Sequence, residues 1–378
     1  MSARVEAVLP FWLDRPDEEA LDIARTVGDV ALDALWIGEM ATYDAFALAT
    51  AIGHRVPGLP LRLGPLAVGV RSPVTLALGA SSVATLTGTT VDIALGASSP
   101  MIVAGWHDRE WAHAAPRVRE TIACLRSLFA GERSDYDGSQ VDVALGGSSP
   151  AIVAGWHDRE WGHAAPRMRE TIECLRSLLA GKRGDYDGHR VRSHGFRLRR
   201  PRPETRIAVG AFGPAITRVA ARHADEVVLN LVPPQWVAQV RATIDGEAAK
   251  VGRTPPSLTV WVPAAYQPGE AALRQLAAQL AVYLAPPGYG EMFCELGYGD
   301  LVRRARAGAG RRELADHVPA DLLGQICVAG STERIAASLR AYHEAGADCV
   351  AVVPSTGGDP GGRAVLAAVA EARTRNKS

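Results

Sequence analysis

The chain has 378 residues, with 41 basic and 41 acidic side chains. This balance, without a block of Lys and Arg among aromatic residues, argues against a nucleic-acid partner. The N-terminal stretch lacks the regions of a secretory signal, and the five cysteines form no C-x-x-C pair. We therefore expect a soluble cytoplasmic protein that has no membrane partner and no metal centre.

Short apolar runs alternate with amphipathic segments along most of the chain. Strand, helix, strand in that order predicts a parallel sheet. In "STERIAASLRAYHEAG", Ser331 is expected to be the N-cap of a helix, and Gly346 marks its end. Strands are expected at residues 5–9, 34–37, 62–70, 91–95, 141–145, 206–209, 226–229, 258–262 and 349–353.

Two segments of the chain, 91–138 and 141–188, are nearly the same, with nine substitutions and no gap. A closed (β/α)8 TIM barrel has room for only one of their two strands, because strand number, tilt and shear are linked. Glu173 replaces Ala123 on a helix face expected to be solvated. We therefore expect one domain over 1–378, in which 141–190 completes the barrel and 91–140 is extruded or swapped between the subunits of a homodimer. A recent genetic accident is the leading explanation for the repeat.

The region 263–325 departs from the alternating pattern and is rich in helix formers. It predicts a helical insertion after the seventh strand. Loops on the carboxyl face of a barrel carry function, so this insertion is a candidate lid.

The run "RIAVGAFGPAITR" predicts a strand, a tight turn and a helix that begins at Pro214. The backbone N–H groups of Gly210, Ala211, Phe212 and Gly213 would converge on an anion there, helped by the helix dipole. An ordinary turn, in which the glycines only ease the bend, is the alternative interpretation.

Two carboxylates are candidate catalytic groups. Glu39 follows the second predicted strand, at the mouth where barrel enzymes build their sites, although a solvated loop carboxylate is the alternative. Glu6 lies inside the first predicted strand. If its side chain faces the barrel interior it would be buried and functional, whereas an outward side chain would form a surface pair.

The segment "GWHDREWAH" spaces His107, Glu110 and His113 three residues apart, and the second copy repeats the pattern. This is not a metalloprotease motif, and the following proline indicates that the helix begins only afterwards. A loop over the barrel mouth is therefore favoured over a metal site. In it, Trp156 with His157, or Trp106 of the first copy, would cover a ligand.

The order of several motifs resembles the bacterial luciferase-like superfamily, and most closely its branch of oxidoreductases that use coenzyme F-420, a deazaflavin. The motifs are "ALWIGEMATYDAFALATAIG", "LRLGPLAVGVRSPVTLALGASSVATLTGTTVDIALGAS", "LRSLLAGKRGDYDG", "GFRLRRP", "IAVGAFGPAITRVAARHADEVV" and "VAGSTERIAASLRAYHEAGADCVAVVP". The resemblance implies an eight-stranded barrel that holds flavin or deazaflavin at its carboxyl mouth.

The resemblance also implies roles for particular residues. The turn "VGAFGP" would bind the cofactor phosphate, and Gly146 with Gly147 would contact the cofactor after the fourth strand. A non-proline cis bulge behind the cofactor ring would lie near Gly69 and Val70. The Asp-His pair of the sugar-phosphate dehydrogenases is replaced by Glu39 and Met40, which argues against alcohol oxidation. Glu6 is similar in placement to a carboxylate of the methylene-tetrahydromethanopterin reductases.

The expected function is therefore hydride transfer between coenzyme F-420 and a small organic substrate. Glu6 or Glu39 would donate the proton, since burial favours the protonated form of a carboxyl group. An FMN-dependent monooxygenase is the first alternative, because its phosphate site would look alike. A barrel that binds flavin or another small ligand without turnover is the second.

Overall fold

The computed structural model describes most of the chain outside the two copies. The described residues are 4–10, 16–38, 43–67, 70–71, 73–96, 121–122, 125, 133–134, 186–187, 192–193, 196–197, 206–286 and 288–375. They form two compact units. Unit 1 consists of Met1–Thr42, Val228–Thr243 and Ser257–Ser378, and unit 2 of Tyr43–Val227 and Ile244–Pro256.

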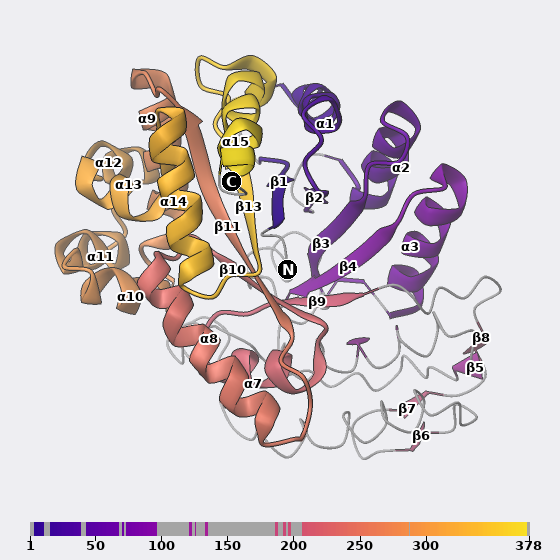
Figure 1. The fold of residues 1–378 in the computed structure, drawn as a ribbon. Coiled ribbons are helices and arrows are strands. Elements are labelled where there is room, and N and C mark those ends of the chain that lie inside the picture. Colours follow the sequence, from indigo (N-terminus) through magenta and orange to yellow (C-terminus); the bar gives the residue numbers. More distant parts are fainter. Residues whose placement is uncertain are drawn as a thin grey trace. The chain divides into compact units, whose positions relative to one another are not determined.

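A parallel sheet forms the centre of unit 1, and most of its strands are labelled in Figure 1. Its order is β2, β1, β13, β11, β12. Four of the five strands were expected from the sequence; β12 was not. The strands are β1 (Arg4–Val8), β2 (Leu35–Ile37), β11 (Ser257–Tyr266), β12 (Val328–Gly330) and β13 (Cys349–Pro354).

One face of this sheet is aliphatic and packs against helices. Val260, Val350 and Val352 are fully buried on it. Helix α15 (Arg363–Arg375) contacts β1 and β11, while α14 (Thr332–Glu344) contacts β13. Because side chains alternate between the faces of a strand, the residues between these valines point to the other face of the sheet.

The ends of α14 follow the sequence signals. The side chain of Ser331 accepts a hydrogen bond from the backbone N–H of Arg334. Gly346 follows the helix with a φ of 98°, a conformation that glycine adopts without strain. Both predictions are confirmed.

Helices occupy most of the region 263–325, although β11 first extends to Tyr266. Its last residues, from Ala264 onward, pair with β12. Figure 1 shows α11, α12 and α13 gathered beside α9. The other helices of unit 1 are α1 (Glu19–Asp29), α9 (Glu270–Tyr283), α10 (Tyr289–Glu295), α11 (Gly299–Arg306), α12 (Arg311–Asp316), α13 (Ala320–Ile326) and the short η3 (Pro360–Gly362).

Unit 2 contains a second parallel arrangement of strands, in which β4 pairs with β3 on one side and with β9 on the other. Helix α7 begins at Pro214, as expected, and the aliphatic strands are buried. The elements are α2 (Ala45–Arg55), β3 (Leu61–Ala67), α3 (Pro73–Thr87), β4 (Val91–Gly96), β9 (Ile207–Gly210) and α7 (Pro214–His223).

The strand of the first copy therefore occupies the fourth position. Ile93 of β4 lies opposite Leu63 and Ile207, so the prediction that 141–145 takes this position instead of 91–95 is wrong. The physical reason is connectivity: only residues 88–90 separate α3 from β4, and short connections place consecutive elements side by side. The counterpart strand at 141–145 lies outside the described residues.

An irregularity interrupts β3. The register with β4 shifts between Leu63 and Leu66, and the Gly64–Pro65 bond is cis. This lies earlier in the chain than the bulge expected near Gly69 and Val70. Gly69 lies outside the described residues, and the N–H of Val70 donates to the carbonyl of Ala67 in a turn that follows the strand.

Two elements continue from one unit into the other, and four short strands complete the described structure. Strand β10 (Glu226–Asn230) and helix α8 (Pro234–Ala249) each span a unit boundary. The short strands form two antiparallel pairs. These are β5 (Arg133–Ser134) with β8 (Phe196–Arg197), and β6 (Tyr186–Asp187) with β7 (Arg192–Ser193).

A buried charge network lies at the amino ends of the strands of unit 2. Glu226 is fully buried and accepts from Arg62 at 2.7 Å, and Arg206 lies 3.2 Å from the same oxygen. The carboxyl of Asp92 lies 3.9 Å from Arg62. Burial raises the pKa of Asp92, and the charge of Arg62 opposes this rise.

No helix in the described residues has the length and apolar character that a membrane crossing requires. The described residues also contain no cluster of three or more His, Cys, Asp or Glu side chains suited to a metal ion.

Candidate functional site

The second face of the unit 1 sheet carries polar and aromatic side chains. Glu6 of β1 lies opposite Ala351 of β13, which lies opposite Trp261 of β11. Residues in register on parallel strands point to the same face. This row faces away from Val260, Val350 and the helices that cover them.

Glu6 is the buried carboxyl of this face, with 1% of its surface exposed. The indole N–H of Trp36 donates to its Oε2 at 2.6 Å. Trp36 of β2 lies opposite Val8 of β1. Because Val8 is two residues beyond Glu6, the side chains of Trp36 and Glu6 emerge on the same face of the sheet. Glu6 thus presents a buried carboxyl group on this face of the sheet, and the neutral indole of Trp36 holds it in place.

Trp261 packs beside this pair. Its ring meets that of Trp36 edge to face, with the centroids 5.2 Å apart and an angle of 69°. Trp261 is 8% exposed, and its Nε1 has no hydrogen-bond partner in the described residues. Aromatic pairs prefer this geometry, so the two indoles fix each other's orientation.

The row that contains Glu6 and Trp261 continues on β10 with a polar residue, Asn230. The N–H of Leu231 donates to the carbonyl of Trp261 at 3.0 Å, which sets Asn230 beside Trp261. The Asn230 side chain is hydrogen-bonded to the phenols of Tyr283 and Tyr289, whose rings lie 4.9 Å apart. Burial raises the pKa of both phenols, which therefore stay neutral. The helical insertion thus contacts the sheet through two tyrosines.

The turn after β9 in unit 2 has the character of an anion site. Gly213 is the N-cap of α7, with a φ of 86° and no side-chain cap. A Cβ at Gly213 would meet nothing within 4 Å. The first N–H groups of a helix lack intrahelical acceptors, and here they lie next to the open space at Gly213.

Pro65 forms a close contact with two strand ends beside this turn. A Cβ at Gly96, the last residue of β4, would lie 2.9 Å from the Pro65 ring, and one at Gly210 would lie 3.2 Å from it. Only glycine fits at these distances without displacing the proline. The ring of Pro65 therefore packs closely against the ends of β4 and β9.

The loop after β13 is also rich in glycine, like the turn after β9, but a side chain of the protein already binds its amides. The Oε1 of Gln275 accepts from the Ser355 hydroxyl and from the backbone N–H groups of Thr356 and Gly357, at 2.8 to 3.0 Å. The N–H of Gly361 donates to Glu19 at 2.9 Å. The amides of this glycine-rich loop are therefore not available to an anion.

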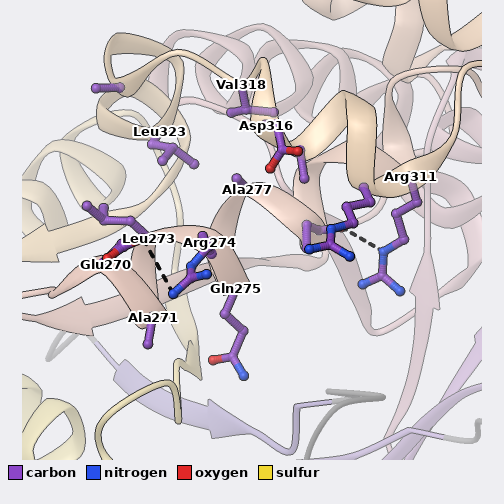
Figure 2. Close-up of a pocket in the computed structure, with 14 residues that line it drawn as sticks. Glu270, Ala271, Leu273, Arg274, Gln275, Ala277, Arg311, Asp316, Val318 and Leu323 are labelled. Carbon is purple, nitrogen blue, oxygen red and sulfur yellow. Dashed lines mark hydrogen bonds and ion pairs between the residues drawn. The ribbon is translucent and has the colours of Figure 1, made fainter.

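A separate groove of about 1190 Å³ lies between α9 and the segment of α12 and α13, as Figure 2 shows. Its charged side chains are exposed: in the Arg274–Glu270 ion pair the side chains are 70% and 84% exposed. The groove is also lined by the apolar side chains of Leu273, Ala277 and Val318. Gln275, a buried polar residue of the lining, uses its Oε1 to hold the loop after β13, so we do not assign catalysis to the groove.

The predicted site residues have different outcomes. The structure places Glu6 on the polar face of unit 1, and Gly210 to Gly213 in the open turn of unit 2. Because β4 comes from the first copy, Gly96 occupies the strand end that was assigned to its counterpart Gly146. Several predicted residues lie outside the described residues, and their roles stay predictions: Glu39, Gly69, Gly146, Gly147, Trp156 and His157.

Sequence reasoning missed three polar side chains of unit 1. Trp36, Trp261 and Asn230 sit in apolar runs, where an aromatic side chain is usually part of the core. One signal was available: Trp36 and Trp261 both fall on the strand face opposite the aliphatic residues, which is the face of Glu6.

Comparison with known proteins gives a family. The model of the family described as luciferase-like monooxygenase matches residues 13–144 and 140–349. The two matched segments meet where the second copy begins.

One curated relative is a protein of Mycobacterium tuberculosis named as a coenzyme F-420-dependent oxidoreductase. It is 24% identical over 124 residues, which cover 33% of this chain and 36% of the relative. The match thus spans about a third of the relative's length.

Solved structures are similar over nearly the whole chain. The coenzyme F-420-dependent tetrahydromethanopterin reductase from Methanopyrus kandleri has a TM-score of 0.70 and 14% identity, covering 98% of this chain and 97% of the other. An F-420-dependent secondary alcohol dehydrogenase in complex with an F-420-acetone adduct has a TM-score of 0.67, 15% identity and coverages of 98% and 99%.

A third structure is the oxygenating constituent of 3,6-diketocamphane monooxygenase from Pseudomonas putida, a type II Baeyer–Villiger monooxygenase in complex with FMN. Its TM-score is 0.62, with 14% identity and 99% of both chains covered. Likeness at this level shows the fold, a closed parallel (β/α)8 barrel of the luciferase-like type, as the sequence predicted. By the match to its family model, the chain belongs to the luciferase-like monooxygenase family.

Proposed function

We propose that the protein is an oxidoreductase that transfers a hydride between coenzyme F-420 and a small organic substrate. The observation that carries the proposal is the buried carboxyl of Glu6, held by Trp36 on the polar face of the sheet, in a chain of this family. Support for the cofactor comes from the relatives that use F-420.

The residues of unit 2 fit a cofactor with a phosphate group. Uncapped amides at the start of α7 and the open space at Gly213 suit an anion. Close packing of Pro65 against Gly96 and Gly210 leaves no side chains at these two strand ends, where a planar ring would meet backbone. When bound, a deazaflavin supplies a position that accepts or donates a hydride. Gly210 to Gly213 would hold its phosphate.

Glu6 would hold and move the proton that accompanies hydride transfer. The hydrogen bond from Trp36 to Oε2 fixes the orientation of the carboxyl, and the carboxyl would carry the proton. Removal from water favours the protonated acid, and general acid catalysis of this kind contributes about 10² to 10⁴ in rate. Glu39 remains the other candidate donor.

A second candidate is an FMN-dependent monooxygenase, favoured by the FMN complex of the Pseudomonas relative. Fluorescence titrations with coenzyme F-420 and with FMN separate the two. We expect binding of F-420. Binding of FMN alone would favour the monooxygenase, and binding of neither would contradict both candidates.

A matched pair of variants locates the phosphate. Ala215→Glu places a negative charge at the second residue of α7, where the helix dipole tolerates it. We expect it to weaken cofactor binding at least about tenfold, which corresponds to about 1.4 kcal/mol. Ala271→Glu makes the same change at the second residue of α9 and should leave binding unchanged. Equal affinities of both variants would argue against the assigned turn.

A further inference from the structure

Trp261 carries a buried polar atom that the protein leaves unused. Its side chain is 92% removed from solvent, being 8% exposed, and its Nε1 has no partner in the described part of the chain. A buried donor without an acceptor destabilises a fold, whereas a phenyl ring would fill apolar space without this penalty. The indole at this position therefore suggests an acceptor that is not part of the chain.

The neighbouring indole shows the contrast. Trp36 contacts Trp261 edge to face at 5.2 Å, but its own N–H donates to Glu6 at 2.6 Å. The N–H of Trp36 thus has an acceptor in the protein, whereas the N–H of Trp261 has none among the described residues. If a bound molecule supplied an acceptor to Trp261, the N–H groups of both tryptophans would be hydrogen-bonded.

The strand register places Trp261 in the same row as Glu6, with Ala351 between them. Neighbouring strands are about 4.8 Å apart, so the two positions are separated by roughly 10 Å. The space between them is filled, because Ala351 is fully buried and the ring of Trp36, which donates to Glu6, lies against the ring of Trp261. A bound molecule would therefore reach the indole of Trp261 beside this contact.

The chemistry of the donor narrows the class of ligand. An indole N–H is neutral and donates one hydrogen bond. Proteins bind carboxylates and phosphates with cations or with several amides, whereas one neutral donor suits a neutral acceptor. The two indole rings provide apolar surface for the rest of the molecule.

We propose that the Nε1–H of Trp261 binds an acceptor oxygen of the substrate. The substrate is then a small neutral molecule with an apolar, ring-sized body and a carbonyl-type oxygen, placed against the indole of Trp261. This inference rests on the proposed function for the presence of a substrate at this face.

The test uses two probes of the same shape, cyclohexanone and methylenecyclohexane, of which only the first has an acceptor oxygen. The full chain is labelled with ¹⁵N, and the indole N–H signals of its eight tryptophans are followed during titration without cofactor. Trp261→Phe assigns the signal and removes the donor. Trp236→Phe makes the same change on α8 as the control, and Trp261→His keeps a ring N–H.

We expect cyclohexanone to move the Trp261 signal. Trp261→Phe should weaken cyclohexanone binding at least about tenfold and leave methylenecyclohexane within about twofold, while Trp236→Phe changes neither. If Trp261→Phe does not fold, Trp261→His assigns the signal and should retain cyclohexanone binding.

Three results would overturn the inference. One is equal weakening of both probes by Trp261→Phe, which would show a packing role. Another is an unmoved Trp261 signal at saturating cyclohexanone. The third is an indole proton that exchanges with water as fast as an exposed one, because solvent would then satisfy the donor. Failure here with intact F-420 binding contradicts only this inference, whereas a shifted signal without F-420 or FMN binding contradicts only the proposed function.

Discussion

Glu6 in unit 1 and Glu226 in unit 2 are both strand glutamates that are almost completely buried, at 1% and 0% exposure. Glu226 faces two guanidinium groups, those of Arg62 and Arg206, at the amino ends of its strands. Glu6 accepts from the neutral indole of Trp36 on the polar sheet face, beside Trp261, whose N–H has no partner among the residues that the structure describes.

The difference indicates two uses of a buried carboxylate. The ion pairs of Glu226 make it part of the stability of unit 2, as expected for the amino face of a barrel. A neutral donor orients Glu6 without adding a charge of its own. The same contrast separates the loop after β13, whose amides Gln275 occupies, from the open turn at Gly213.

Breaking the Glu226 network should have the largest effect on stability. Glu226→Gln keeps the shape but removes the charge facing Arg62, which is 5% exposed. We expect the free energy of unfolding to fall by about 3 kcal/mol, the lower end of the range for buried pairs, because Asp92 still faces Arg62. Urea unfolding measures it. The exposed pair Glu333–Arg375 gives the control, since Glu333→Gln should change little. Equal stability of both variants would contradict the role of the network.

Gln275→Leu should have the next largest effect. The substitution leaves the Ser355 hydroxyl and two backbone N–H groups without their acceptor, and we expect a loss of about 2 kcal/mol. Gln279→Leu on the same helix is the control, because the Oε1 of Gln279 is already buried without a partner. It should be neutral or stabilising. If both variants lose the same stability, the loop is not held by Gln275.

A smaller, pH-dependent effect is expected from Asp92. Burial raises its pKa in the folded state above the ordinary 3.8, against the charge of Arg62. The folded state therefore binds the proton more tightly, and its contribution to stability is lost as the pH rises from 3.8 through the folded-state pKa. Asp92→Asn lacks this loss, so its stability relative to wild type should rise with pH over that window. A difference that stays constant with pH would refute the assignment.

Much of the fold could be predicted because buried parallel strands leave apolar runs in the sequence. The runs near Val5, Ile93 and Val350 are strands, and the Ser331 cap begins its helix. Strand β12 was missed because three residues show no period, and β11 was cut short because its pairing with β12 is a tertiary effect. The copies are too alike for local signals to choose between them; connectivity decides.

The candidate site was less predictable. Glu6 could be found because a carboxylate within an apolar strand is unusual. An indole in an apolar run usually indicates core, and the alternation of faces groups Trp36 and Trp261 with Glu6 only once the register of four strands is known. The turn after β9 could be predicted from its glycines and from Pro214, which sets the start of a helix; its phosphate role stays a prediction.

The most direct test measures stability and hydride transfer on the same variant, Glu6→Gln. Its amide oxygen can still accept from Trp36 but cannot deliver the proton. We predict unfolding within about 1 kcal/mol of wild type and hydride transfer between coenzyme F-420 and substrate slowed at least about 100-fold. Unchanged transfer, or a loss of stability like that of Glu226→Gln with transfer intact, would contradict the assignment of Glu6 to function.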